Sequence, residues 1–567
     1  MQSEGPMSVV LLWHMHQPEY RDLRSGVTHL PWTYLHAIKD YVDMAAHLEA
    51  QPAARVVVNF TPILLEQIED YIAQVDSFLN GHGTIRDPVL SQLAEPALPS
   101  SEEDRLRLVQ YCLRANRERM IDRFAPYQRL ASMAEWYEAH PRSLIYASNQ
   151  FIADILMWYH IAWMAESVRR NDPRIARFID KEVNFTLHDR RELLEILLEQ
   201  LRSIVPRYRE LAQQERVELC MSPYAHPIVP LLIDMECARD AMPQAHLPVA
   251  EDYPGGRERA LWHLDHGLAV FERVFGRQPA GIWPSEGGVS QEALQLFAER
   301  GFRWAASGGS VLHNSHDNDD DDCTHRVYRF GDADIDCIFR DDGLSDLIGF
   351  TYSDWHAEHA VANLVGHMEN IAELCPDRER CLITIILDGE NAWEYYPENG
   401  FHFITELYAK LAENPLLRMS TLSEFLERGS PEPLHEERLV AGSWVYGTFS
   451  TWIGDPDKNR AWDLLVEAKR CFDEQVARGN LAPDELAAAE QQLAICEGSD
   501  WFWWFGDYNP SATVGQFDYL YRLHLANLYQ LLKLEAPTNL SEVISRGGGA
   551  PSRGGVMRHH SESGGAS

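Results

Sequence analysis

Short apolar runs alternate with long amphipathic stretches along this chain of 567 residues. An apolar run that ends abruptly in polar or glycine residues is typical of a strand buried on both faces of a parallel sheet. The expected strands are Ser8–Trp13, Arg55–Phe60, Arg216–Cys220, Phe302–Ala306, Asp334–Phe339, Leu382–Leu387 and Leu417–Thr421. Strands that alternate with helices predict an α/β fold, a parallel barrel whose ligands bind where the carboxyl ends of the strands converge.

Two regions of the chain have a helical pattern. Between about residues 62 and 206, apolar residues recur at intervals of three and four, which predicts a large helical insertion with a strand-like break at Ser143–Ser148. Further helices are expected at Asp457–Gln475, Pro483–Cys496 and Gln516–Leu534. We therefore expect a barrel domain over residues 1–428, a helical domain over 429–540 and a disordered low-complexity tail over 541–567.

Composition excludes several classes of partner. The formal net charge of −36 disfavours nucleic acid and anionic lipid, whereas a neutral ligand is indifferent to it. No apolar run approaches the ~20 residues of a membrane helix, and the N-terminus lacks the features of a signal peptide. The nine cysteines are scattered without a CxxC pair, which indicates reduced thiols in a cytoplasm. Nothing in the pattern indicates an oligomeric state.

Two carboxylates stand out by their settings. Asp388 directly follows the strand Leu382–Leu387 and precedes the aromatic Trp393, which suits a site that protonates a ligand and stacks on a sugar ring. The alternative is that Asp388 or Asn391 only caps the next helix. Glu286 lies between a proline turn and a glycine pair, a setting that a surface glutamate does not need.

Histidines follow two of the expected strands. His14 and His16 form an H-x-H on an extended segment, so their imidazoles point to the same side. They can be a metal pair, two hydrogen-bonding groups for one ligand, or two core histidines. No third ligand follows at zinc-like spacing, which disfavours a metal. His226 lies in a loop that prolines hold extended.

The remaining candidates lie later in the chain. Arg340 and Asp342 follow the strand Asp334–Phe339, and the acidic run His316–Asp322 is interpreted as a solvated loop without the glycine and closing glutamate of a calcium site. The loop Glu497–Asp507 holds three tryptophans and two phenylalanines that cannot all face one core. Some of them are therefore expected to face a cleft, although core packing is the alternative for any single tryptophan.

Two isolated carboxylates with flanking aromatic residues are the groups that glycoside hydrolysis requires. The chain has no Ser-His-Asp set, no phosphate-binding glycine loop before a helix and no convincing metal triad. We therefore expect neither a cofactor nor a metal.

At these residues the sequence resembles glycoside hydrolase family 57, whose members act on α-glucans. The first, third and fourth family signatures resemble His14–Pro18, Gly281–Glu286 and Asp388–Asn391. The second signature is less sharp and its counterpart is Ser222–His226. The tryptophan-rich fifth resembles Asp500–Trp504 and is closer to the α-amylase and amylopullulanase branch.

The resemblance implies an incomplete (β/α)7 barrel, a retaining mechanism and no metal in the chemistry. It implies Glu286 as nucleophile and Asp388 as acid/base. The expected contacts with the glucan are His14, His16, His226, Trp283, Arg340, Asp342, Trp393, Asp500, Trp501 and Trp503.

We accordingly expect a cytoplasmic hydrolase of α-1,4-linked glucans, with α-1,6 linkages as a further option. The alternatives are a 4-α-glucanotransferase or branching enzyme of the same family, a non-catalytic glucan-binding protein, and a metal-dependent deacetylase on a similar barrel.

Overall fold

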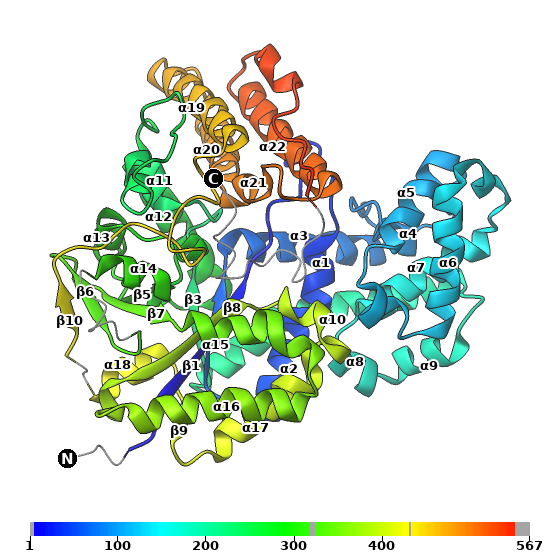
Figure 1. Ribbon diagram of the computed structural model, residues 1–567. Helices are drawn as coiled ribbons and strands as arrows, with labels where there is room; N and C mark the ends of the chain where they lie inside the picture. Colours follow the sequence, from blue (N-terminus) through cyan, green and yellow to red (C-terminus); the bar gives the residue numbers. More distant parts are fainter. Residues whose placement is uncertain (1–4, 317–323, 430–431, 550–567) are drawn as a thin grey trace.

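The computed structural model describes residues 5–316, 324–429 and 432–549, and a mainly parallel sheet forms its centre (Figure 1). Seven parallel strands follow one another in the order β7-β5-β4-β3-β2-β1-β8. They are β1 (Met7–Met15), β2 (Val56–Phe60), β3 (Val217–Met221), β4 (Gly281–Ile282), β5 (Trp304–Gly308), β7 (Asp336–Arg340) and β8 (Leu382–Asp388).

No ladder joins the edge strands β7 and β8 in the described part of the chain, so the sheet does not close. A backbone hydrogen bond of 2.8 Å from Asp341 N to Thr384 O bridges the gap instead. Three short strands lie outside the series of seven: β6 (Tyr328–Phe330), β9 (Leu417–Met419) and β10 (Leu434–Glu436). The predicted incomplete (β/α)7 barrel is confirmed.

Alternation along the strands creates two separate cores. Val9 and Leu11 of β1 belong to the large core between sheet and helices, whereas Val10 and Leu12 belong to a second core inside the barrel. Other members of the inner core are Val57, Cys220, Trp304, Ile338, Ile386, Leu422 and Phe425.

The same alternation places polar side chains at the barrel mouth. Four residues of the inner core are each followed, two positions later on the same strand, by a polar residue. Leu12 is followed by His14, Val57 by Asn59, Ile338 by Arg340 and Ile386 by Asp388. The inner core therefore ends in a polar layer at the carboxyl ends of the strands.

Helices connect the strands, as parallel pairing requires. The largest group lies between β2 and β3, and most of it forms a lobe beside the barrel, on the right in Figure 1. This group comprises α3 (Pro62–Leu79), α4 (Ser91–Ala94), α5 (Glu102–Cys112), α6 (Ala125–Ala139), α7 (Asn149–Ala162), α8 (Glu166–Asn171), α9 (Pro173–Lys181) and α10 (Leu187–Gln213).

The other connections are shorter. They contain α1 (Trp32–His36), α2 (Val42–Ala50), α11 (Val229–Ile233), α12 (Gly256–Phe275), α13 (Gln291–Glu299), α14 (Gly309–Ser315), α15 (Asp342–Asp346), α16 (Ala357–Leu374), α17 (Phe401–Glu413) and α18 (Leu422–Gly429).

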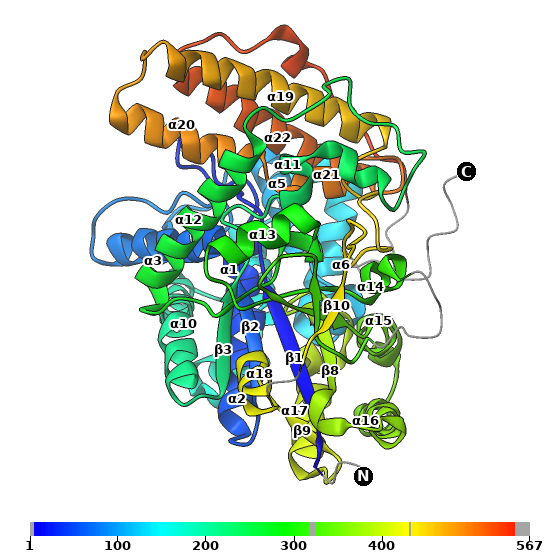
Figure 2. The same ribbon diagram turned by 90° about the vertical axis from the view of Figure 1, so that its left-hand side faces the viewer.

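Four C-terminal helices lie above the carboxyl ends of the strands, at the top of Figures 1 and 2. They are α19 (Pro456–Ala477), α20 (Pro483–Cys496), α21 (Ser499–Trp504) and α22 (Ser511–Leu531). This position brings the end of the chain to the mouth of the barrel. No helix among the described residues is long and apolar enough to cross a membrane.

Several expectations about local structure are wrong. The break at Ser143–Ser148 is not strand-like, because a 3₁₀ helix covers Pro141–Tyr146. The strand at Leu417 pairs only with the start of β1 and is not part of the series of seven. The tail does not begin at residue 541, since Ile544 and Ser545 are buried against α22 through bonds to Asp518. Residues 550–567 and the acidic run at 317–322 lie outside the described residues.

Gly281 in β4 offers a test of the packing inside the barrel. A Cβ atom there would lie 1.8 Å from the Trp304 ring, which is fully buried. Gly281→Ala should therefore lower the free energy of unfolding by roughly 2–3 kcal/mol, as overpacked core substitutions do. Urea unfolding measures it, with Gly366→Ala as the control, because a Cβ at Gly366 in α16 meets nothing within 4 Å. Equal stability of the two variants would contradict the packing described here.

Candidate active site

Glu286 lies in a strained turn after β4. The 3₁₀ turn at Ser285–Gly287 holds Glu286 at φ 58° and ψ 25°. This left-handed conformation costs a residue other than glycine roughly 1–3 kcal/mol and is found mainly at functional sites. The backbone N–H of Trp444 donates to the carbonyl of Glu286 at 3.1 Å, and Gly308 of β5 leaves room for Trp444, since a Cβ there would come within 2.6 Å of Trp444 Cα.

Both carboxylate oxygens of Glu286 have partners from distant parts of the chain. Trp444 Nε1 donates to Oε2 at 3.0 Å, and Ser499 Oγ lies 3.4 Å from Oε1. His226 Nδ1 lies 3.8 Å from the same Oε1. The side chain is only 12% exposed, so these contacts fix the direction in which it points.

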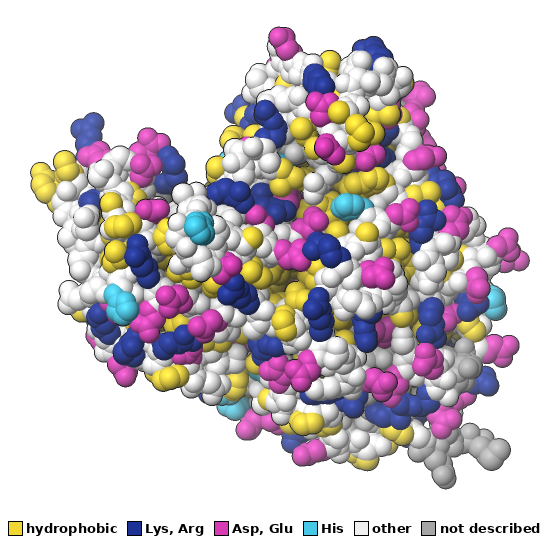
Figure 3. Space-filling view, turned by 180° about the vertical axis from the view of Figure 1, so that it is seen from behind, with side chains coloured by type: hydrophobic (Ala, Val, Ile, Leu, Met, Phe, Trp, Pro, Cys, Tyr) yellow, Lys and Arg dark blue, Asp and Glu magenta, His cyan; other side chains and the backbone are white. Residues whose placement is uncertain are grey.

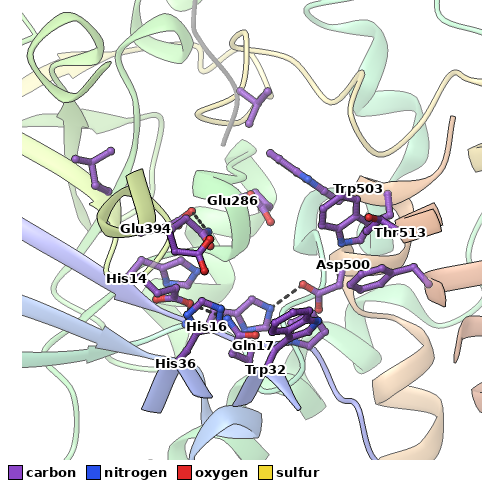
Figure 4. A pocket seen from close by; sticks show the side chains of 18 of the residues that line it. His14, His16, Gln17, Trp32, His36, Glu286, Glu394, Asp500, Trp503 and Thr513 are labelled. Carbon is purple, nitrogen blue, oxygen red and sulfur yellow. Dashed lines mark hydrogen bonds and ion pairs between the residues drawn. The ribbon is translucent and has the colours of Figure 1, made fainter. Parts of the chain in front are cut away.

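Asp388 ends β8 directly beside His14, because the two are partners in the parallel register. Asn391 Nδ2 donates to Asp388 Oδ2 at 2.7 Å and makes no capping bond to the turn that follows, so the helix-cap alternative does not hold. Asp388, His14 and Glu286 all line one cavity. Figure 4 shows His14 and Glu286 in it.

The two carboxyls influence each other's ionisation. Burial, followed by the negative charge of Asp388, raises the pKa of Glu286 to about 8. Burial also raises the pKa of Asp388, although the Asn391 hydrogen bond and the charge of Arg340 oppose this. Neighbouring buried carboxyls do not readily ionise together, and the raised pKa values of both groups reflect this.

The cavity has a volume of about 450 Å³ and lies where the barrel, the helical lobe and the C-terminal helices meet. The face turned away from the viewer in Figure 1 carries acidic, basic and hydrophobic side chains interspersed with one another (Figure 3). The aromatic lining of the cavity consists of Tyr20, Trp32, Trp163, Phe350, Trp444, Tyr446, Trp503, Trp504 and Phe517. An apolar wall with a few convergent polar groups is typical of a site for a small organic ligand.

Three histidines form a stack on one side of the cavity. The ring of His226 lies 4.0 Å from that of His16 and 5.2 Å from that of His14, with the planes nearly parallel. Burial and the neighbouring histidines lower the pKa of His14 to about 3 and that of His226 well below its usual range. The stack is therefore uncharged at these two positions near neutral pH.

His16, His226 and Asp500 place one ligand atom each within 4.8 Å of one another, a spacing at which a metal ion could be held. Both ring nitrogens of His16 already have partners, Nδ1 with Thr61 Oγ1 at 2.9 Å and Nε2 with Asp500 Oδ1 at 2.8 Å. Face-to-face rings also direct their lone pairs side by side, whereas tetrahedral coordination needs them to converge. The arrangement fits hydrogen bonding better than zinc.

The chain matches the model of glycosyl hydrolase family 57 over residues 10–438. This chain belongs to glycosyl hydrolase family 57. The family resemblance expected from the sequence is thereby confirmed. No curated protein sequence matches the chain.

Solved structures of family 57 and related enzymes share its fold. A GH57 branching enzyme from Thermococcus kodakaraensis has a TM-score of 0.55 and 16% identity, with 93% of this chain and 90% of that one covered. The α-amylase AmyC from Thermotoga maritima has a TM-score of 0.56 and 13% identity, with 93% of each chain covered. The 4-α-glucanotransferase from Thermococcus litoralis has a TM-score of 0.52 and 12% identity, with 93% and 60% covered.

Most of the site residues expected for this family 57 member reach the cavity. His14, His16, Arg340, Asp500 and Trp503 line it together with the two carboxyls. Arg340 is held there by Asp342 at 2.8 Å, by Asp346 at 3.0 Å and by the carbonyl of Ile386.

Five expected contact residues are not in the lining. Trp283, Trp393 and Trp501 are fully buried behind the cavity wall, and Trp501 donates to the carbonyl of Ile495. Asp342 supports Arg340, and His226 lies under His16. The segment around Trp501 is the helix α21 and not a loop, so successive aromatic residues point to different sides.

Sequence reasoning missed four polar or aromatic residues of the family 57 site. Asn59 bonds His14 at 2.6 Å, Glu390 accepts from Gln17, and Trp444 and Ser499 contact Glu286. Asn59 could have been found, because it ends an apolar strand at an inward position. Trp444 and Ser499 carry no such signal, since their proximity to Glu286 arises only from the tertiary fold.

The histidine stack generates a prediction about metal. The enzyme dialysed against a strong chelator should keep its full activity and its melting temperature, because His16 is already hydrogen-bonded at both nitrogens. Metal analysis of the purified protein and activity before and after dialysis measure this. A stoichiometric transition metal whose removal abolishes activity would show that the stack is a metal site.

Proposed function

We propose that this family 57 enzyme cleaves α-1,4-glucosidic bonds in glucans by a retaining mechanism. The observation that carries the proposal is that Glu286 and Asp388 line one aromatic-lined cavity, where the charge of Asp388 helps to raise the pKa of Glu286. The printed activities of the structural neighbours, which include an α-amylase, a branching enzyme and a 4-α-glucanotransferase, support an α-glucan as the substrate.

In the first step Glu286 attacks the anomeric carbon and forms a glycosyl-enzyme, while Asp388 gives its proton to the leaving oxygen. In the second step Asp388 takes a proton from an incoming hydroxyl group, which attacks the anomeric carbon and releases Glu286. The active form thus carries its charge on Glu286, which the donors Trp444 Nε1 and Ser499 Oγ stabilise.

Polar groups around the pair suit the hydroxyls of the cleaved sugar. His14, Arg340 and Asp500 line the cavity beside the two carboxyls. Trp503 and Trp504 form one wall and Trp32 and Trp163 another, so that glucose rings on both sides of the cleaved bond meet aromatic faces.

The second step decides between hydrolysis and transfer, since water gives hydrolysis and a sugar hydroxyl gives a new glucan. Incubation with maltooligosaccharides, starch and pullulan, followed by product analysis, tests the proposal. Hydrolysis yields only shorter chains, whereas transfer yields longer or branched ones, and cleavage of pullulan would add α-1,6 linkages. Binding of glucan without formation of any product would instead support the non-catalytic alternative.

Glu286→Gln tests the nucleophile. The amide cannot attack carbon, so turnover should fall by roughly 10⁴-fold or more while glucan binding and the melting temperature persist, as expected when a covalent nucleophile is removed. Activity assays and binding to immobilised glucan measure the two. Glu292→Gln, an exposed glutamate six residues further on, is the control. More than a few per cent of residual activity in Glu286→Gln would sink the assignment.

Trp504 tests the aromatic wall. This residue is partly exposed, lines the cavity and stacks on Phe517 with ring centroids 5.0 Å apart. Trp504→Ala should weaken the use of long glucans more than that of maltotriose, because only long chains reach the edge of the cavity. The comparison is the ratio of kcat/KM values for the two substrates.

Trp501→Ala is the matched control for Trp504→Ala. Trp501 is buried in the core, so its truncation should cost roughly 3–5 kcal/mol of stability and affect all chain lengths equally. The same uniform loss in Trp504→Ala would mean that Trp504 is also only a packing residue.

A further inference from the structure

Glu286, the nucleophile of the proposed reaction, lies in the barrel, but the side chains that donate hydrogen bonds to its carboxylate come from outside the barrel. Both side-chain hydrogen bonds to Glu286 come from residues after position 440, namely Trp444 Nε1 to Oε2 and Ser499 Oγ to Oε1. Ser499 is the first residue of α21 and is 1% exposed. The C-terminal helices therefore supply a hydroxyl group to a carboxylate of the barrel.

Ser499 and His226 hold each other by two reciprocal bonds. The backbone N–H of Ser499 donates to the carbonyl of His226 at 2.9 Å, and His226 Nδ1 lies 2.9 Å from Ser499 Oγ. His226 itself has a left-handed backbone with φ 59°. A strained residue of this type persists only where its surroundings fix it, and the two bonds to Ser499 do so.

The direction of these hydrogen bonds follows from the chemistry of the groups. A carboxylate only accepts, so Ser499 gives its single proton to Glu286 Oε1. Its oxygen can then accept a proton from His226 Nδ1, which fixes the tautomer with hydrogen on Nδ1. His226 Nε2 is correspondingly a lone pair, and it is buried without a hydrogen-bond partner among the described residues.

Glu497 anchors the serine from the other side. This carboxylate is fully buried and accepts from Arg259 and His263 of α12 and from Tyr253. Against the effect of burial, the charge of Arg259 and the bond from His263 lower the pKa of Glu497 to about 2. An ionised pair of this type, two residues before Ser499, ties the start of α21 to the barrel.

We propose that Ser499 is a positioning residue for the nucleophile, the middle member of a chain His226–Ser499–Glu286 that is held in place by Glu497. The proposal rests on the proposed function, because it assigns the direction and the charged state of Glu286 in that reaction. Ser499 does not touch the substrate; it stabilises the carboxylate form that attacks.

The pH dependence of the reaction separates this role from simple packing. Charged or titratable groups facing Glu286 are Asp388, Asp500 and His226, while His16 and Arg340 act on Asp388. In the proposed reaction the active monoanion carries its charge on Glu286 and its proton on Asp388, so it loses the charge on the acid side and the proton on the alkaline side. Glu286 therefore gains its charge in the acid transition. Removal of a hydrogen-bond donor to Glu286 should therefore shift only the acid limb of the pH profile of kcat/KM.

The experiment compares Ser499→Ala, Ser499→Thr and Ser545→Ala with the unchanged enzyme. Ser545 is a buried serine of the same C-terminal region outside the cavity and serves as the matched control. The measurements are kcat/KM on a maltooligosaccharide as a function of pH, and the melting temperature.

Ser499→Ala should lower kcat/KM roughly tenfold at neutral pH, the effect of one hydrogen bond to a charged group. It should move the acid limb to a pH about one unit higher, because a pKa change of one unit corresponds to the free energy of such a hydrogen bond. The alkaline limb should stay unchanged. Ser499→Thr should restore the acid limb, and Ser545→Ala should leave both limbs in place. The position of a limb does not depend on the fraction of folded enzyme, so a loss of stability cannot mimic the shift.

An unchanged acid limb in Ser499→Ala would overturn the proposal, whatever the loss of rate. A shift of both limbs by the same amount would overturn it as well, since the serine would then act on the whole pair. Failure of the proposed function is distinguishable from both, because Glu286→Gln would then retain activity.

Discussion

The pairing of β1 with a neighbour on each edge determines where the chemistry can occur. In the parallel register His14 stands opposite Asn59 of β2 on one side and Asp388 of β8 on the other. Because side chains alternate between the faces of a strand, the apolar interior of the barrel and its polar mouth belong to the same inward-facing rows. A shift of one residue in either ladder would turn the acid/base candidate toward the helices.

Polar groups at the mouth of the barrel are removed from water, and their hydrogen bonds offset the free-energy cost of this desolvation. Arg340 is held between two carboxylates and a carbonyl, and His16 between a threonine and an aspartate. Glu286 has donors at both oxygens, yet its charge is still opposed by Asp388. The site thus combines an extensive hydrogen-bond network with one electrostatic conflict, in which the charge of Asp388 raises the pKa of Glu286.

Much of the barrel could be predicted from the sequence because buried parallel strands leave an unambiguous pattern. The run before Asp388 and the glycine-flanked Glu286 indicated strand ends with functional carboxylates. Two-residue β4 could not be recognised as a strand, since it lies within a single turn of proline and glycine residues. Trp503 and Trp504 of the aromatic cluster line the cavity, as expected of some of its members, whereas Trp501 is buried, because composition does not show which side of a helix each ring occupies. Contacts such as Ser499 with Glu286 join residues 213 positions apart, and no local pattern encodes them.

The position of α21 determines when the cavity can form during synthesis of the chain. Synthesis proceeds from the N-terminus, so all seven strands and both carboxyls leave the ribosome before Trp503 and Asp500 exist. A nascent chain can assemble the barrel and still lack one wall of its cavity and the hydroxyl group at Glu286. On the proposed function, catalysis therefore requires that α21 has been translated and has docked on the barrel.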